Sequence, residues 1–310
     1  MYDTINLWLS SEQAGTKDLL AFSEKHLQNI TAHNKQDGQV NYSGFLRNYK
    51  VNVSQAGISL KGSLAKYHLP DNFHTLNRGD TQRAIEMVAD DLHLLIDKAK
   101  VTRIDFAQNF LMRYEPKAYY SYLGECLHYQ RFCQPESLYY NNGLRTKLFY
   151  NKIAEGKARG LILPNVWNGQ NVLRYELRFK SRLPQQFNQP EIKASTLYDE
   201  QFYISMVRQW IDEYKSINKL NFINFNLTEM NSPKDFRKQL ELIAVNAIGQ
   251  DRLMQMIEEM RIKKAFDKPE YYSRLKKELR ELCKTPDLTC SSDMVAELDK
   301  KIVAAKQYYR

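Results

Sequence analysis

The chain has 310 residues, and its 45 Lys and Arg against 36 Asp and Glu give a formal net charge of +9. Hydrophobic residues make up 43% and charged residues 26%, while 12 Gly and 9 Pro are too few for a disordered or fibrous chain. The first residues lack the pattern of a signal peptide, and no apolar run is long enough to cross a bilayer. We therefore expect a globular cytoplasmic protein without a membrane-spanning segment.

Strand patterns come first along the chain. Residues 3–9 alternate apolar and polar side chains, and residues 40–53 and 57–67 have the pattern of two strands joined by a turn. The spacing of the apolar residues then becomes helical over residues 81–98, with Asp80 as the expected N-cap. This part predicts a sheet with a helix packed against it.

A hairpin is the clearest pattern in the middle of the chain. A strand over residues 101–112 and a short helix over 117–127 precede it. The hairpin consists of residues 137–140, an Asn-Asn-Gly turn and residues 144–151. A last strand follows over residues 171–180, so the strands come largely in sequence and predict antiparallel pairing.

The remainder of the chain has helical periodicity. Apolar residues recur at helical spacing from about residue 195, and residues 184–190 form the expected linker. Together the patterns predict an α+β fold, with an antiparallel sheet covered by helices on one face and open on the other. We expect two domains, 1–190 with the sheet and 196–310 with an α-helical C-terminal domain.

Four cysteines fall in two pairs, each with a spacing of seven residues: Cys126 with Cys133, and Cys283 with Cys290. The sequence contains no C-x-x-C motif, which argues against a zinc ribbon. We expect free thiols in a reducing compartment.

The positive charge is concentrated in two segments. Residues 141–183 contain nine basic residues against only Glu155 and Glu176, and residues 42–66 contain four basic residues and no acid. Such a concentration favours a partner that carries phosphates. The 20 tyrosines suit stacking on the bases of a single strand, although each one also suits a core or rim position.

Strand alternation places specific polar residues on the open face. In residues 101–112 the face opposite Phe106 carries Arg103 and Asp105, and in residues 171–180 the face opposite the core carries Glu176 among basic residues. Tyr139 lies on the face opposite Leu138 and Tyr140, so it is the tyrosine expected to join these carboxylates. Carboxylate oxygens suit Mg²⁺ or Mn²⁺, but each carboxylate equally suits an ion pair with a neighbouring arginine.

Four motifs carry a resemblance to a known family: GSLAKYHLPDNF (62–73), TRIDFAQNF (102–110), SLYYNNGLRTKLFYNK (137–152) and LRYELRF (173–179). In order and spacing they resemble the replication initiators of the filamentous-phage gene II/X family. They are also similar to staphylococcal-type rolling-circle plasmid initiators and to conjugative relaxases. The resemblance covers roughly residues 1–185 and implies a fold related to that of the His-hydrophobic-His (HUH) nickases.

The resemblance implies a metal-dependent DNA nicking-and-joining endonuclease. Its tyrosine attacks a phosphodiester of single-stranded or supercoiled origin DNA, stays linked to the 5′ phosphate and leaves a 3′-OH primer. Tyr139 corresponds to the nucleophile, Asp105 and Glu176 to ligands of Mg²⁺ or Mn²⁺, and Lys152 to a lysine near the scissile phosphate. Because a phenol with a reference pKa of about 10 is a weak nucleophile at neutral pH, such a tyrosine needs a positive environment.

Several positions leave alternatives open. Tyr140 and Tyr150 are rival nucleophiles, and Lys147 is the alternative to Lys152, whose strand position points to the apolar face unless the strand ends there. The sequence has no His-hydrophobic-His motif, so an additional ligand would come from His68 or His74. Asn109 stands where plasmid relatives often have a second acid.

The expected DNA contacts come from the basic residues of both segments and of the strand that carries Asp105. They are Lys61, Lys66, Arg103, Arg145, Lys147, Arg174, Arg178 and Lys180. The expected partners are origin DNA, a host helicase and a polymerase, with no membrane. A relaxase acting at a transfer origin and a non-catalytic nucleic-acid-binding protein are the alternative functions, and the oligomeric state stays open.

Overall fold

The computed structural model describes residues 1–15, 19–36, 38–69, 71, 73–161, 163–220, 232–283 and 293–306. The chain divides into two compact units. The first comprises Met1–Tyr120, Glu125–Ile217 and Lys300–Arg310, and the second Ser121–Gly124 and Asn218–Asp299. No helix in the described ranges is long and apolar enough to cross a membrane.

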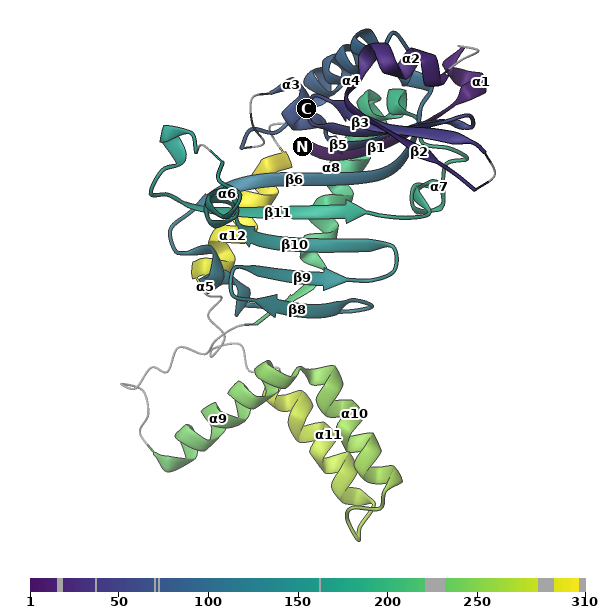
Figure 1. The fold of residues 1–310 in the computed structure, drawn as a ribbon. Helices are drawn as coiled ribbons and strands as arrows, with labels where there is room; N and C mark the ends of the chain where they lie inside the picture. Colours follow the sequence, from purple (N-terminus) through teal and green to yellow (C-terminus); the bar gives the residue numbers. More distant parts are fainter. Residues whose placement is uncertain are drawn as a thin grey trace. The chain divides into compact units, whose positions relative to one another are not determined.

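A ten-stranded antiparallel sheet dominates the first unit (Figure 1). Its strand order is β2-β3-β4-β5-β1-β6-β11-β10-β9-β8, so β1 and β6 lie at its centre. The strands are β1 (Tyr2–Ser10), β2 (Gln28–Asn34), β3 (Val40–Leu46), β4 (Tyr49–Ser54), β5 (Gly57–Ser63), β6 (Lys100–Met112), β8 (Gln130–Gln134), β9 (Ser137–Asn141), β10 (Arg145–Asn151) and β11 (Asn171–Phe179). A second sheet pairs β7 (Leu123–Cys126) with β12 (Ile217–Lys219).

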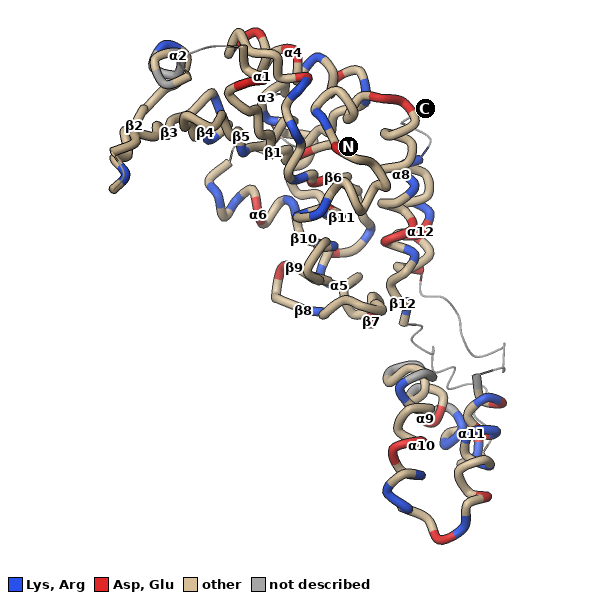
Figure 2. The backbone as a smooth tube through the Cα atoms, turned by 90° about the vertical axis from the view of Figure 1, so that its right-hand side faces the viewer, with Lys and Arg blue, Asp and Glu red and all other residues tan. Residues whose placement is uncertain are grey.

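Helices cover one face of the large sheet. Figure 2 shows the sheet curved and seen from its edge, with α4 and α8 on the convex side and α6 on the concave side. The α-helices described in the chain up to residue 215 are α1 (Ser11–Ala14), α2 (Leu19–His26), α3 (Leu64–His68), α4 (Arg78–Leu92), α5 (Pro116–Tyr120), α6 (Lys152–Ala158), α7 (Leu183–Gln186) and α8 (Glu200–Lys215). Within the described residues, 3₁₀ helices cover Ile96–Lys98, Asn165–Trp167 and Ala194–Tyr198. The predicted α+β fold, with a sheet covered on one face, is confirmed.

Helix α8 is tied to the sheet by aromatic side chains. Its Trp210 ring centroid lies 4.7 Å from that of Tyr175 on β11, which in turn stacks on Phe149 of β10 at 4.6 Å. Each such aromatic pair contributes about 0.5–1.5 kcal/mol beyond its burial. Because of this packing α8 belongs to the first unit, which differs from the predicted domain boundary between residues 190 and 196.

Several predicted elements have other limits in the structure. The stretch 40–53 is two strands, because the chain turns at Arg47, which has a left-handed φ of 50°. Helix α4 begins before residue 81 because Asn77, not Asp80, is the N-cap: its Oδ1 accepts a hydrogen bond from the Asp80 amide at 2.8 Å. The expected helix 117–127 ends at Tyr120 and is followed by β7.

The second unit contains a small core of its own. Its helices are α9 (Pro233–Ile248), α10 (Gln250–Ile262) and α11 (Glu270–Cys283), while α12 (Asp293–Ala304) runs from the second unit into the first. The core consists of Val245, Ile257, Tyr272 and Leu279. Cys126 and Cys133 have free thiols, as expected, whereas Cys290 and the side chain of Cys283 lie outside the described residues.

Candidate active site

The open face of the sheet carries two carboxylates close to each other. In the register of β6 and β11, Asp105 pairs with Arg178 and Ala107 pairs with Glu176, so Asp105 and Glu176 are diagonal neighbours. Both side chains are buried, with 2% and 3% of their surface exposed. The alternation of the strands therefore places these acids together, as the sequence predicted.

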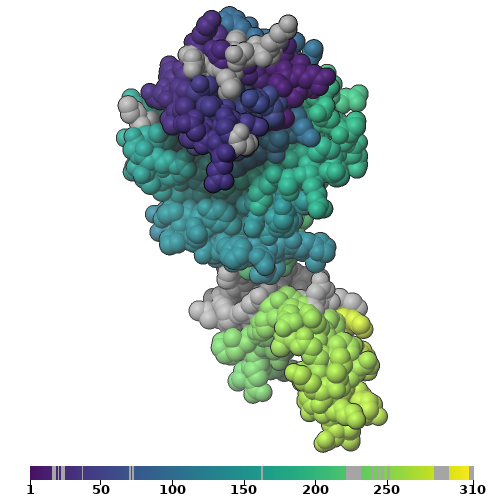
Figure 3. Space-filling model, turned by 45° about the vertical axis from the view of Figure 1, so that its right-hand side comes forward, coloured from purple at the N-terminus to yellow at the C-terminus, as the bar shows by residue number. Residues whose placement is uncertain are grey.

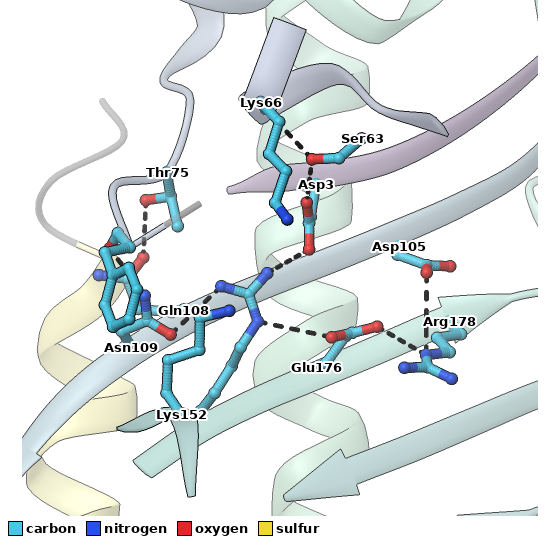
Figure 4. Close-up of polar contacts among 12 residues, drawn as sticks. Asp3, Ser63, Lys66, Thr75, Asp105, Gln108, Asn109, Lys152, Glu176 and Arg178 are labelled. Carbon is cyan, nitrogen blue, oxygen red and sulfur yellow. Dashed lines mark hydrogen bonds and ion pairs between the residues drawn. The ribbon is translucent and has the colours of Figure 1, made fainter. Parts of the chain in front are cut away.

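Arginines separate the carboxylates in an alternating row (Figure 4). Arg103 donates to both oxygens of Asp105, at 2.8 and 2.7 Å. Arg178 Nε lies 2.6 Å from Glu176 Oε1 and 3.7 Å from Asp105 Oδ2. Beyond Glu176 the row continues through Arg174, whose guanidinium also pairs with Asp3. The alternative that each carboxylate pairs with an arginine is thus what the structure shows.

A third acid, Asp3, joins this row because β1 is irregular. Tyr2 pairs with Phe106 and Ile5 with Ile104, so three steps on β1 match two on β6. The simple alternation of residues 3–9 puts Asp3 on the same face as Ile5, and for that reason the pattern did not reveal this acid. The bulge turns Asp3 to the open face instead, where it accepts a hydrogen bond from Ser63 Oγ at 2.5 Å.

The environment changes the pKa values of two of these acids. Burial raises the pKa of Asp105 to about 7, and the Glu176 carboxylate adds to the rise, while Arg103 opposes it. Burial also disfavours the charged form of Asp3, but Arg174 and the hydrogen bond from Ser63 lower its pKa overall. The row thus contains one acid that titrates near neutral pH and one that stays ionised.

Tyr139 lines a hollow of about 410 Å³ on the same face. Its neighbours there include Arg103, Arg178 and Lys180. A second hollow of about 470 Å³ contains Asp3, Asp105 and Glu176, and Arg103 and Arg178 line both hollows. Figure 3 shows the surface of the first unit hollowed between its N-terminal strands, in purple, and the later strands, in teal. The same two arginines therefore connect the hollow of Tyr139 with that of the carboxylates.

The two rival tyrosines occupy different environments. Tyr140 is fully buried on the covered face, where it packs edge-on against Phe149, and burial raises its pKa above the usual value. Tyr150 lies on the open face in the second hollow, with its hydroxyl 3.5 Å from Glu176 Oε2. Burial raises the pKa of Tyr150 well above its ordinary value, which keeps the phenol protonated.

Lys152 does not line the hollow of Tyr139. The strand ends at Asn151, whose side chain caps α6, so Lys152 no longer follows the alternation of β10. Its ammonium group bonds Glu155 at 2.9 Å and lies 5.1 Å from the Phe73 ring centroid. Burial lowers the pKa of Lys152, and Arg174 lowers it further. The structure therefore places Lys152 beside the row rather than next to Tyr139.

Arg145 and Lys147 lie on the covered face, not on the DNA-facing side expected from the sequence. Arg145, Lys147 and Phe149 are alternate residues of β10, so their side chains lie on the same face of the sheet. Arg145 and Lys147 both form ion pairs with Glu213 of α8. Lys147 has no exposed surface and also donates to the Glu213 carbonyl and to Ser216 Oγ, each at 2.7 Å. The predicted DNA contacts of these two residues are corrected: they hold α8 to the sheet.

Arg174 is on the open face, but it is also unavailable to DNA. Its side chain is fully buried, and besides Asp3 and Glu176 it bonds Asn109 Oδ1 at 3.2 Å. Asn109, predicted to stand in place of an acid, therefore helps to hold Arg174, while its amide nitrogen donates to the Phe73 carbonyl at 2.7 Å. The expectation that Arg174 contacts DNA is corrected to an internal role.

The remaining predicted cations lie on the open face. In the strand registers Lys50 pairs with Lys61, Lys61 with Asn6, and Asn6 with Arg103. These four residues form a row across the sheet, here called the basic row, in which Lys61 is exposed. Near Tyr139, Lys180 Nζ donates a hydrogen bond to Asn141 Oδ1 at 2.6 Å. Burial lowers the pKa of Lys180, and the positive charges of Arg103 and Arg178 lower it further. Lys66 lines the second hollow with Asp3.

The two candidate histidines are not directed to the carboxylates. His68 lies 3.9 Å from Asp80, and His74 lies 3.3 Å from Asp71. Within the ranges that the structure describes, no three His, Cys, Asp or Glu side chains gather in a group that could hold a metal ion. The oxygens of Asp105 and Glu176 have the chemistry of Mg²⁺ or Mn²⁺ ligands, but a cation there would have to displace Arg178 from both and Arg103 from Asp105.

A comparison with known protein families matches most of the chain to a family model. A family model for the N-terminal part of the phage replication-associated protein of the gene II type matches residues 1–213, which extend from β1 into α8. No curated protein matches the sequence. The matched segment contains Tyr139, the carboxylates and the basic row.

Proposed function

Because the chain belongs to the phage family of gene II-type replication-associated proteins, which are rolling-circle replication initiators, we propose that it nicks and rejoins origin DNA with Tyr139. One observation carries the proposal: Tyr139 shares its hollow with Arg103, Arg178 and Lys180, whereas burial keeps Tyr150, in the second hollow beside the same two arginines, protonated. Three cations beside a phenol form a site for a phosphodiester.

The proposed reaction is a transesterification. A bond forms between Tyr139 Oη and the phosphorus as the bond from phosphorus to the 3′ oxygen breaks. The phenol loses its proton, the departing 3′ oxygen takes one up, and the 5′ phosphate stays on the tyrosine. Since the phosphotyrosine bond retains the energy of the broken bond, attack by a 3′-OH reverses the step and rejoins a strand.

The cations around Tyr139 would act on the phosphate. Arg103 and Arg178 are only partly buried, with 34% and 29% of their side chains exposed, so both can reach a phosphate at the surface. Their guanidinium groups would neutralise the charge that builds on the non-bridging oxygens as the tyrosine attacks.

We further propose that Asp105 and Glu176 hold Mg²⁺ or Mn²⁺ when DNA is bound. A bound phosphate competes for Arg103 and Arg178, and the release of both arginines would free Asp105 and one oxygen of Glu176. The cation would supply additional stabilisation of negative charge on the phosphate. Asp3 would stay with Arg174, whose buried charge requires a partner.

The basic row supports a path for a single strand across the open face. It leads from Lys50 and Lys61 on the N-terminal side of the sheet to Arg103, which lines the hollow of Tyr139. Phosphates bound along such a row would bring the strand to the tyrosine. The 3′-OH that the reaction leaves is a primer, so a polymerase and a helicase are the partners we expect.

The test is to trap the covalent product. Purified protein with Mn²⁺ and supercoiled DNA carrying its own origin should give a nicked circle with protein attached, and peptide mapping should locate the DNA on Tyr139. Tyr139→Phe should abolish the product, whereas Tyr150→Phe, which removes the other open-face phenol, should retain it. An adduct in Tyr139→Phe would refute the assignment, and DNA binding without any adduct would favour the non-catalytic function.

A further inference from the structure

An exposed aromatic residue faces the same hollow as Tyr139. Phe132 lies on β8, the edge strand, and pairs directly with Tyr139 in the register of β8 and β9. Directly paired residues share one face of a sheet, so both rings lie on the open face. Half of the Phe132 surface is exposed, although a phenylalanine gains about 1.5–3 kcal/mol from full burial.

The other residues of this hollow complement the parts of a nucleotide. Arg103, Arg178 and Lys180 suit its phosphate, and the amides of Gln134 and Asn141 suit the polar edge of a base. Phe132 supplies an apolar ring of the kind on which a base stacks. The volume of about 410 Å³ lies within the range of pockets that bind small ligands.

We propose that this hollow is a subsite for one nucleotide, in which Phe132 stacks on the base next to the scissile phosphate. The inference rests on the proposed function and adds a positioning residue to it. A base held on Phe132 fixes its phosphate near the Tyr139 hydroxyl, because both rings project from paired positions on the same face. Phe132 itself takes no part in the bond exchange.

The subsite also determines the form of DNA that the protein accepts. A base in a duplex is stacked on its neighbours, so it reaches Phe132 only after it has left the helix. The cleavage position must therefore be single-stranded or locally melted, and negative supercoiling would make the melting easier. Stacking on an aromatic ring tolerates every base, so Phe132 adds affinity at one position without fixing the sequence.

The first test separates bases from phosphates. Binding of about a dozen linked thymidines is compared with binding of an abasic strand of the same length, in the Tyr139→Phe background, at 0.15 M salt. Phe132→Ala should weaken binding of the thymidine strand about 5- to 150-fold and leave that of the abasic strand within about twofold. Phe132→Trp should restore the affinity for the thymidine strand. Tyr271→Ala, which removes an exposed aromatic ring of α11, should change neither.

The second test locates the subsite. Single abasic positions are placed along the strand around the mapped cleavage site, and one position next to the scissile phosphate should lose most of the affinity. That loss should disappear in Phe132→Ala and persist in Phe45→Ala, which removes a similarly exposed ring paired with Lys50 at the far end of the basic row.

The outcomes distinguish the two proposals. If Phe132→Ala weakens the thymidine and abasic strands equally, or changes neither, the subsite is refuted whether or not the protein nicks DNA. If Phe132→Ala unfolds, as circular dichroism would show, Phe132→Leu retains the apolar volume and should show the same selective loss in a smaller degree. Absence of an adduct with wild-type protein would instead overturn the proposed function.

Discussion

The basic residues of β10 lie on the covered face and those of β11 on the open face, and the two faces use them differently. On the covered face Arg145 and Lys147 converge on Glu213 of α8. On the open face Arg178 lies between Asp105 and Glu176 and remains partly exposed. The basic segment of the sequence is therefore not one surface: alternation divides it into cations that fix a helix and cations that can meet a phosphate.

The cations of the two faces differ in the free energy that is lost when their carboxylate partner is removed. A fully buried ammonium such as that of Lys147 cannot be rehydrated, so loss of its carboxylate costs several kcal/mol. A partly exposed guanidinium such as that of Arg178 can exchange a carboxylate for water or for a phosphate at small cost. Variants of the two faces should therefore fail in opposite ways.

The largest effect should follow removal of Glu213. Glu213→Ala leaves the charges of Lys147 and Arg145 without their common partner, and the free energy of unfolding of the first unit should fall by about 3–5 kcal/mol. Urea denaturation followed by tryptophan fluorescence measures this, since Trp210 lies in α8. Glu115→Ala, which breaks the exposed pair with Lys117, should lower the free energy of unfolding far less. If both variants lost the same free energy of unfolding, the contrast between buried and exposed cations would be wrong.

Arg178→Ala should show the opposite behaviour. The loss of a charged contact to the phosphate should slow nicking about 10- to 150-fold, while the free energy of unfolding should fall by less than in Glu213→Ala, because Arg174 still pairs with Glu176 and Arg103 with Asp105. Single-turnover nicking and urea denaturation measure the two quantities. Arg178→Lys should recover part of the rate. A stability loss as large as that of Glu213→Ala would show that Arg178 is mainly structural.

The sequence was sufficient for residues whose strands are regular. Asp105, Glu176 and Tyr139 were placed on one face by alternation alone, and the register of β6, β11 and β9 agrees. Asp3 was not predictable, because the bulge that turns it depends on how β1 meets β6. The edge strands β2 and β8 carry mostly exposed side chains, so an apolar pattern could not reveal them.

The wrong prediction of DNA contacts for Arg145 and Lys147 has a different cause. The alternation that points Lys152 to the apolar face puts Lys147 on the opposite, DNA-facing side, and the local excess of positive charge favours that prediction. The missing fact was Glu213, about 66 residues later in the chain, which the packing of α8 brings to Lys147. A buried cation is thus predictable only when its long-range partner is known.

The affinity for Mn²⁺ should depend on pH. With a pKa of about 7, Asp105 carries a proton below neutral pH and cannot then ligate a cation. Mn²⁺ affinity of the DNA complex should therefore fall up to about tenfold for each pH unit below 7 and level off above it. Titration calorimetry with uncleaved DNA and Tyr139→Phe protein measures this. Asp105→Asn should bind weakly at every pH, and an unchanged pH profile in that variant would exclude Asp105 as the titrating ligand.

The smallest effect should come from the basic row. Lys61 is exposed and far along the row from Tyr139, so it adds one phosphate contact without touching the reaction. Lys61→Ala should weaken binding of a single strand about two- to fivefold for any sequence, and the slope of log affinity against log salt should decrease by about 0.7 to 1. Fluorescence anisotropy between 50 and 200 mM salt measures both. Lys215→Ala, at the exposed end of α8 on the covered side, should change neither, because only the open face carries the strand.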